Sequence, residues 1–388
     1  DLTHVMAGPT CTLMQADMGA DVIKVEKIPG GDDTRRSVPP TIGGEAGAFM
    51  MMNRNKRGVA LDLKTVGGRR VLARLLEDAD VVVENYRPGT MAKLGFDYEA
   101  LRKRNPGLIY CALSGFGRTG PYGHRGGFDL VAQAMSGIMS ITGEGPGRPP
   151  VKCGAPLTDI TCGILAAMGI LAAYAHRLRT GEGQMVETSL LEAGIVQTYW
   201  QSAIALATGV APGPLGSAHP LNAPYQAFET ADGWIVIGAN NQRLWTRLLE
   251  VLGAVHLADD PRFRERHDRM AHLKELETAL APYFRQRASA DWLARLEDAG
   301  VPAGPVYDVL EMQADPQVRA REMVVEVEHQ RLGPVRTLGL PVKFSDTPGK
   351  VLAGAPLYGQ HTRAVLEEHG FDDGAIAALV RDGAVVIA

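Results

Sequence analysis

The sequence predicts an α/β protein, in which a doubly wound parallel sheet forms a large domain and a smaller α+β domain follows. Short apolar runs, such as residues 79–83 and 108–113, alternate with helix-like segments such as 66–77. This alternation is typical of βαβ units with right-handed crossovers. A chain of 388 residues is also longer than one hydrophobic core usually supports, so two structural units are expected.

The overall composition narrows the class of protein. The chain is 45% hydrophobic and 22% charged, with a net charge of −4, and it has no basic stripe. Nucleic acid and anionic membranes are therefore poor partners. The longest weakly polar run, residues 163–175, is too short to span a bilayer. The four cysteines show neither CxxC nor paired histidine spacing, so we expect free thiols, no metal site and a cytoplasmic enzyme.

The first 26 residues predict one βαβ unit. Residues 4–6 are interpreted as a strand end, 10–18 as a helix and 21–25 as the second strand. Glu26 ends that strand where the ribose-binding acid of an NAD site would lie. However, the turn at residues 7–9 lacks G-x-G-x-x-G, so NAD is not expected.

The next segments predict where a ligand would bind. Residues 27–57 form a long loop-rich stretch, and the βαβ alternation resumes at residue 59. In parallel sheets, ligands bind beyond the carboxyl ends of the strands. Loops 84–89 and 114–129 follow predicted strands, so they are expected to line the pocket.

In residues 153–191, the carboxylate Asp159 lies between a Pro/Gly loop and a long run of small apolar residues. At this position an aspartate is most often the N-cap of the following helix, predicted here over residues 161–177. The alternative is a carboxylate nucleophile held among the helix N-terminal amides. The local sequence alone leaves both interpretations open.

The second half of the chain predicts a change of domain. The Pro/Gly-rich residues 209–224 resemble a linker, and residues 225–238 predict a β-hairpin with an Asp-Gly turn. Charged helices are predicted beyond it. We therefore divide the chain into a large domain over 1–208, a linker over 209–224, a small α+β domain over 225–325 and a return to the large domain over 326–388.

Several long motifs resemble one known family. They include AGPTCTLMQADMGADVIKVE, GGDDTRR, VVVENYRPGTMAKLGFDYEAL, GGFDLVAQAMSG, DITCGILAAMGILAA and RTGEGQMVETSLLEA. These segments are similar to the family III CoA-transferases, the group of the carnitine and formyl-CoA transferases, and the similarity extends over essentially the whole chain. The stretch GSAHPLNAPYQAFETADGWIVIGANNQRLW further resembles the succinyl-CoA:glutarate branch.

The resemblance implies a fold and a site. Family members are interlocked homodimers with a Rossmann-like large domain, and their active site lies between the large domain of one subunit and the small domain of the other. The family's nucleophilic aspartate corresponds to Asp159. The positions that correspond to its coenzyme A contacts are Met6, Ala7, Lys27, Leu61, Asp62, Leu63, Lys64, Asn85, Tyr86, Arg87, Lys93, Arg125, Gly126, Gly127, Phe128 and Asp129.

The resemblance also implies a reaction, in which CoA moves from an acyl-CoA to a carboxylic acid without ATP, metal or NAD. The alternative is the family's α-methylacyl-CoA racemase branch, but that reaction needs a histidine base where this chain has Phe128. A CoA-binding protein without catalysis is disfavoured because Asp159 is present. Succinyl-CoA and a dicarboxylate are the expected substrates. Arg118, His124, Arg125 and His219 are candidates for the distal carboxylate, although each could equally be structural.

Overall fold

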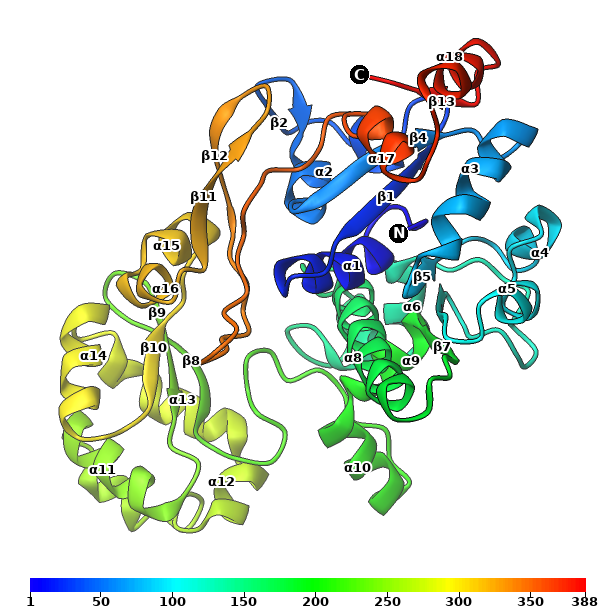
Figure 1. The fold of residues 1–388 in the computed structure, drawn as a ribbon. Helices are drawn as coiled ribbons and strands as arrows, with labels where there is room; N and C mark the ends of the chain where they lie inside the picture. The colour runs from blue at the N-terminus through cyan, green and yellow to red at the C-terminus, as the bar shows by residue number, and fades with distance from the viewer. The chain divides into compact units, whose positions relative to one another are not determined.

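The computed structural model describes all 388 residues, which form two compact units (Figure 1). The first contains residues 1–138, 152–198 and 316–388, and the second contains 139–151 and 199–315. The sequence analysis placed the main boundaries at 208 and 325. In the structure these two boundaries lie ten residues earlier, after residues 198 and 315. Residues 139–151 also belong to the second unit.

The first unit contains two three-stranded sheets, one mixed and one parallel. In one, β1 (Val22–Lys27) pairs in parallel with β4 (Lys56–Leu61), and β13 (Val385–Val386) joins β4 antiparallel. In the other, β6 (Ile109–Ser114) lies between β5 (Val81–Glu84) and β7 (Met185–Ser189), all parallel. The predicted parallel strands are therefore present, but their pairing gives two sheets where we predicted one.

The first residues of the chain lie between the two sheets. The Val25 N–H donates to the Asp1 carbonyl (2.9 Å), and the Leu2 N–H donates to the Val83 carbonyl (2.8 Å), so residues 1–2 pair with both β1 and β5. The strand predicted at residues 4–6 is absent, because Val5 has a left-handed backbone (φ 70°) and turns the chain into α1 (Ala7–Asp17).

Helix α3 (Val66–Glu77) illustrates why the sequence forms these elements. The Thr65 hydroxyl accepts the Gly68 N–H at its N-terminus, and Val71, Leu72, Leu75 and Leu76 form its buried face. The predicted helix 66–77 is confirmed. The other elements between β1 and α8 are η1 (Asp33–Arg36), β2 (Thr41–Ile42), β3 (Glu45–Ala46), α2 (Gly47–Met52), α4 (Thr90–Leu94), α5 (Tyr98–Arg104), α6 (Asp129–Met135) and α7 (Ile138–Ile141).

Helix α8 (Leu157–Thr180) is the longest helix, with 24 residues against the 17 predicted. By length and composition this helix could cross a membrane, although the core helix of a soluble protein passes the same test. This corrects our expectation that the apolar run at residues 163–175 is too short to span a bilayer. Its buried side carries small residues. A Cβ added to Gly163 would lie 2.5 Å from the Ala7 carbonyl oxygen, so this glycine permits the close crossing of α1 and α8.

The second unit is an α+β fold. Strand β9 (Trp234–Gly238) pairs antiparallel with β8 (Tyr225–Glu229) and with β10 (Ala303–Pro305), which confirms the predicted hairpin. Trp245 and Phe284 lie in its core. Its helices are α10 (Tyr199–Thr208), α11 (Gln242–Leu252), η2 (Val255–Ala258), α12 (Arg266–Ala271), α13 (Leu273–Phe284), α14 (Ser289–Asp298) and α15 (Val309–Ala314).

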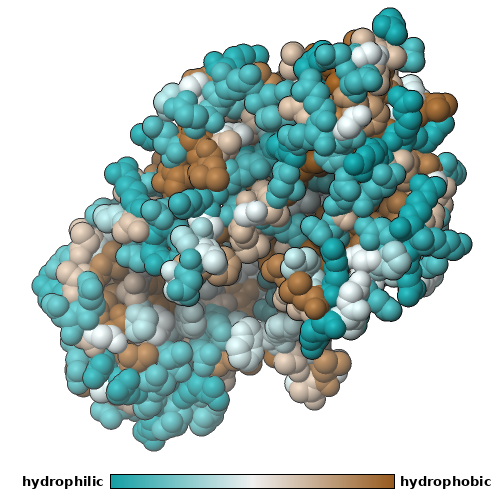
Figure 2. All heavy atoms as spheres, in the orientation of Figure 1, coloured by the Kyte–Doolittle hydropathy of each residue, from teal (hydrophilic) through white to brown (hydrophobic).

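The end of the chain returns to the first unit, where β13 closes the edge of β4. The intervening elements are α16 (Pro316–Ala320), β11 (Val324–His329), β12 (Gly333–Leu338), α17 (Thr362–Glu368) and α18 (Asp373–Arg381), while α9 (Leu190–Val196) follows β7. Hydrophilic residues cover most of the face in Figure 2, and hydrophobic groups interrupt them in several places.

Candidate active site

A cavity of about 350 Å³ lies where β5 and β6 end, and loops of the first unit line it. The carboxyl ends of these strands are where the sequence analysis expected a ligand pocket. Ten of the predicted site residues line this cavity: Met6, Ala7, Asn85, Tyr86, Arg87, Arg125, Gly126, Gly127, Phe128 and Asp159.

The other predicted site residues lie outside its lining. Lys27 pairs with Asp33 (2.7 Å), and both side chains are about half exposed. Leu61 is fully buried in β4. The Asp62 carboxylate accepts the Lys64 N–H (2.9 Å), which shapes the turn after that strand. Leu63, Lys93 and Asp129 do not line the cavity either.

Asp159 is the third residue of α8, in its first turn. The N-cap is Pro156, which makes no side-chain cap, and the Asp159 carboxylate makes no hydrogen bond or ion pair. The capping interpretation of Asp159 is therefore wrong. Burial raises the pKa of Asp159 to about 6, and the negative charge of Asp129 adds to the shift.

Asp129 caps α8 from a different element. Its Oδ1 accepts both the Thr158 N–H (3.0 Å) and the Thr158 hydroxyl (2.7 Å), and its Oδ2 accepts the Gln133 side-chain amide (2.7 Å). Thr158 precedes Asp159, so this contact fixes the turn that carries the candidate nucleophile. Sequence reasoning missed the contact because it joins residues 29 apart, with no local pattern to indicate it.

The segment before α1 is held in a strained conformation at the edge of the cavity. Val5 is β-branched and left-handed, an uncommon combination that surrounding contacts must stabilise. The Asn85 side chain accepts the His4 N–H (3.0 Å) and donates to the His4 carbonyl (2.8 Å). Asp32 accepts the Val5 N–H (3.2 Å). These contacts set the direction of Met6 and Ala7.

Asp32 is itself buried in an ion pair with Lys24 (2.9 Å). Burial alone would raise the pKa of Asp32, but the charge of Lys24 and the hydrogen bonds from Thr34 outweigh it and hold the pKa at about 2. The stabilisation is therefore present above pH 4, and it is lost as the pH falls towards 2.

Replacing Asp32 with alanine is expected to lower the free energy of unfolding at pH 7 by about 3–5 kcal/mol, because the buried Lys24 ammonium loses the nearer of its two carboxylate partners. Urea denaturation measures the effect. Asp33→Ala is the matched control, since its partners Lys27 and Arg36 are exposed, and it should change stability by less than about 1 kcal/mol. Equal losses in both variants would contradict a special role for the Asp32 pair.

Two glycines bring the other loops of the cavity together. A Cβ on Gly115 would lie 2.6 Å from the Gly127 Cα, and a Cβ on Gly127 would lie 2.6 Å from the Gly115 Cα. The loop after β6 and the segment before α6 can therefore cross only because neither residue has a side chain. This crossing places Arg125 and Phe128 at the cavity.

The candidates for a distal carboxylate differ in their surroundings. Arg118 is already paired with the buried Glu84 (2.9 Å). Arg125 stacks over the Tyr122 ring (4.1 Å), lines the cavity and makes no ion pair. His124 is exposed and does not line the cavity. His219 lies in the second unit, stacked on Tyr225. Arg125 is thus the candidate best placed to meet an anionic substrate.

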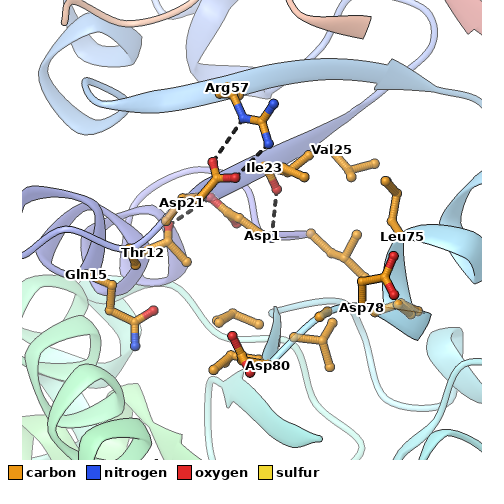
Figure 3. A pocket seen from close by; sticks show the side chains of 18 of the residues that line it. Asp1, Thr12, Gln15, Asp21, Ile23, Val25, Arg57, Leu75, Asp78 and Asp80 are labelled. Atoms are coloured by element: carbon orange, nitrogen blue, oxygen red, sulfur yellow. Dashed lines mark hydrogen bonds and ion pairs between the residues drawn. The ribbon is translucent and has the colours of Figure 1, made fainter. Parts of the chain in front are cut away.

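A larger cavity of about 690 Å³ lies elsewhere in the first unit, between β1 and β5 (Figure 3). Arg57 reaches Asp21 at one side, and Asp78 and Asp80 lie at the other. None of the predicted site residues lines it. Size alone therefore does not identify the site, and the smaller cavity contains the chemically relevant groups. No group of three His, Cys, Asp or Glu side chains in the chain is arranged to hold a metal.

Comparison with known proteins identifies the family. The model of "CoA-transferase family III" matches residues 1–362. The chain is 38% identical to succinyl-CoA:glutarate CoA-transferase of Mus musculus, with 99% of this chain and 88% of that protein covered. It is 41% identical to acetyl-CoA:oxalate CoA-transferase of Acetobacter aceti (95% and 93% covered). A crystal structure of a CAIB/BAIF family protein from Brucella suis superimposes with a TM-score of 0.84 at 40% identity (95% and 97% covered). The chain therefore belongs to CoA-transferase family III.

Proposed function

We propose that this CoA-transferase moves CoA from succinyl-CoA to a dicarboxylic acid, with Asp159 as the covalent nucleophile. The observation that carries the proposal is the state of the Asp159 carboxylate. It faces the cavity without a hydrogen-bond partner, and its pKa of about 6 leaves it ionised at neutral pH. A carboxylate that is partly desolvated and fixed in orientation is a better nucleophile than one in water.

The reaction proceeds by two exchanges. Asp159 attacks the acyl-CoA carbonyl, the C–S bond breaks, and a mixed anhydride and CoA thiolate form. The thiolate is a good leaving group because thiol pKa values are about 8.5. It then attacks the Asp159 carbonyl, which releases the donor acid and leaves an aspartyl-CoA thioester. The acceptor carboxylate then attacks this thioester, which gives a new mixed anhydride and CoA thiolate. The thiolate attacks the acceptor carbonyl of that anhydride, which gives the new acyl-CoA and free Asp159.

Loops around the cavity supply the proposed CoA contacts. Arg87 and Arg125 line it without ion pairs, so their guanidinium groups are free to meet a phosphate or carboxylate. Met6, Ala7 and Phe128 offer apolar contact beside Asp159. The remaining proposed contacts, carried over from the family resemblance, are Lys27, Leu61, Asp62, Leu63, Lys64, Asn85, Tyr86, Lys93, Gly126, Gly127 and Asp129.

The proposed acceptor is a dicarboxylate because the relatives are named for glutarate and for oxalate, which are both dicarboxylates. Succinyl-CoA is proposed as the donor on the name of the mouse relative. Arg125 would pair with the distal carboxylate of the acceptor, since it lines the cavity and makes no ion pair.

We further propose the interlocked homodimer, in which the site is completed by the small domain of the other subunit, with the large domain built from both ends of the chain. An apolar stripe on α8 supports an interface between copies. Ile164, Met168, Leu171 and Leu178 repeat at helical spacing and are 47–72% exposed. Such a stripe on a helix is typical of a face that another helix covers.

Met168→Glu combined with Leu171→Glu is expected to convert the dimer to monomer or aggregate, since two charges cannot be desolvated in an apolar interface. Light scattering coupled to size exclusion measures the mass. Val66→Glu is the matched control, because Val66 is also exposed (77%) but lies on α3, outside the stripe. A dimer of unchanged stability in the double variant would exclude the stripe as the interface.

The proposed reaction is tested by mass spectrometry of the protein after incubation with succinyl-CoA and quenching with hydroxylamine. A hydroxamate at Asp159 in the wild type, absent from Asp159→Ala, is the expected result. An acceptor screen with glutarate, oxalate and mesaconate then identifies the second substrate. Absence of any adduct, together with exchange of the substrate α-proton in deuterated water, would overturn the proposal in favour of a racemase.

A further inference from the structure

Gln133 contacts both Asp129, whose carboxylate caps α8, and the loop that runs into α8. It lies on α6 and is completely buried. Its Nε2 donates to Asp129 Oδ2 (2.7 Å), and its Oε1 accepts the Cys153 N–H (2.9 Å). A third, longer contact joins Nε2 to the Ala155 carbonyl (3.4 Å). The side-chain amide therefore uses its donor and its acceptor at the same time.

These contacts converge on Asp159 by two routes. Through Asp129, Gln133 fixes the carboxylate that accepts the Thr158 N–H and hydroxyl. Through Cys153 and Ala155, it fixes the loop that runs into α8. A buried amide is costly to desolvate unless its groups are satisfied, and satisfied buried networks hold a single geometry.

We propose that Gln133 is a positioning residue for the transfer reaction, which sets the orientation of the Asp159 carboxylate through Asp129 and through the loop before α8. The expected effect of Gln133 on the reaction rate rests on the proposed function. The expected effect of Gln133 on the position of Asp159 rests only on the hydrogen bonds described above. Small displacements of a reacting group reduce rates strongly, by up to about 100-fold for 1 Å.

The test compares three variants. Gln133→Leu removes both functions of the amide at similar volume. Gln133→Glu keeps the acceptor for the Cys153 N–H but donates to Asp129 only while it is protonated. Gln197→Leu is the matched control, because the Gln197 Nε2 also bonds α8, at the Thr161 hydroxyl (2.7 Å), but has no contact with Asp129.

The first readout is the single-turnover rate constant for covalent labelling of Asp159 by succinyl-CoA, with KM and kcat. Gln133→Leu should reduce the rate constant by about 10- to 100-fold and change KM for the acyl-CoA less than about threefold. Gln197→Leu should leave both unchanged. Compared with the wild type at the same pH, Gln133→Glu should lose little activity where its new carboxyl is protonated and progressively more as that carboxyl ionises beside Asp129. If the labelling rate constant fell only in proportion to a lower thermal unfolding midpoint of the variant, Gln133 would have a structural role and the proposal would be overturned.

The second readout needs no catalysis and separates the two proposals. Carboxyl-¹³C aspartate NMR follows the titration of Asp159, assigned with Asp159→Asn. The charged and titratable groups around it are Asp129 on α6, Cys162 on α8, and His4, Tyr86, Arg87 and Arg125 at the cavity. In Gln133→Leu the pKa of Asp159 should fall, since a displaced Asp129 carboxylate acts on it less. In Gln197→Leu it should not move.

The outcomes are distinct. If the wild type forms no covalent adduct, the proposed function fails, and the titration alone decides the role of Gln133. If the wild type is labelled but Gln133→Leu is labelled equally fast, or if the pKa of Asp159 is the same in both, Gln133 does not position Asp159 and the inference is wrong.

Discussion

Replacing Asp159 with asparagine is expected to reduce kcat by at least about 10⁴-fold, because the variant has no carboxylate with which to form the anhydride. The same substitution is expected to stabilise the fold at pH 8 by about 1–3 kcal/mol. The pKa of Asp159 is raised from 3.8 to about 6, so holding it ionised in the native state opposes folding. A tenfold change in a protonation equilibrium corresponds to about 1.4 kcal/mol. Partial solvent access reduces the full effect.

The sign of this effect follows from proton binding. Between pH 3.8 and 6 the native state holds the Asp159 proton more often than the unfolded state does, so wild-type stability falls as the pH rises through this range. The difference between Asp159→Asn and the wild type should therefore be large at pH 8 and disappear below about pH 4. Steady-state kinetics and urea denaturation at both pH values measure the two effects.

Asp373→Asn is the matched control for this prediction. Asp373 also lies in the first turn of a helix, α18, but its side chain is 90% exposed. It should change neither kcat nor stability measurably. Loss of activity without a gain in stability at pH 8 would contradict the raised pKa. Unchanged activity would contradict the nucleophile.

The pH profile of kcat/KM is expected to fall on its acid side with an apparent pKa of about 6, because only the ionised Asp159 attacks the thioester. In Asp129→Asn this limb should move to lower pH, since one of the two causes of the raised pKa is removed. It should stay above 3.8, since burial is the larger cause and persists. The maximal rate should also fall, because an asparagine cannot accept from both Thr158 and Gln133 in the same way.

Asp97→Asn provides the comparison. Asp97 caps α5 by accepting the Ala100 N–H (2.8 Å), as Asp129 caps α8, but it is not part of the cavity lining. Its profile should coincide with that of the wild type. An acid limb near pH 4 in the wild type, or an unmoved limb in Asp129→Asn, would show that Asp129 does not influence Asp159.

The sequence by itself determined the parts of this protein that depend on local pattern. The apolar run before Glu84 predicted a strand, because a strand that is buried on both faces has apolar residues throughout. Residues 66–77 predicted a helix, because a helix that is buried on one side has a single apolar stripe. The Asp-Gly turn predicted the hairpin of the second unit. The long motifs likewise indicated the family, and Asp159 as its candidate nucleophile.

Only the tertiary structure decided which groups act on Asp159. The local sequence favoured a helix cap at Asp159, but the cap of α8 is supplied by Asp129, which is 30 positions earlier in the chain. The Asn85 clamp on His4 spans 81 residues. Crossings such as that of Gly115 and Gly127 likewise join separate segments. Contacts of this kind have no period or spacing in the sequence, since packing between elements sets their geometry. The raised pKa of Asp159, on which the proposed chemistry depends, has the same origin, because it comes from burial and from Asp129 on another helix.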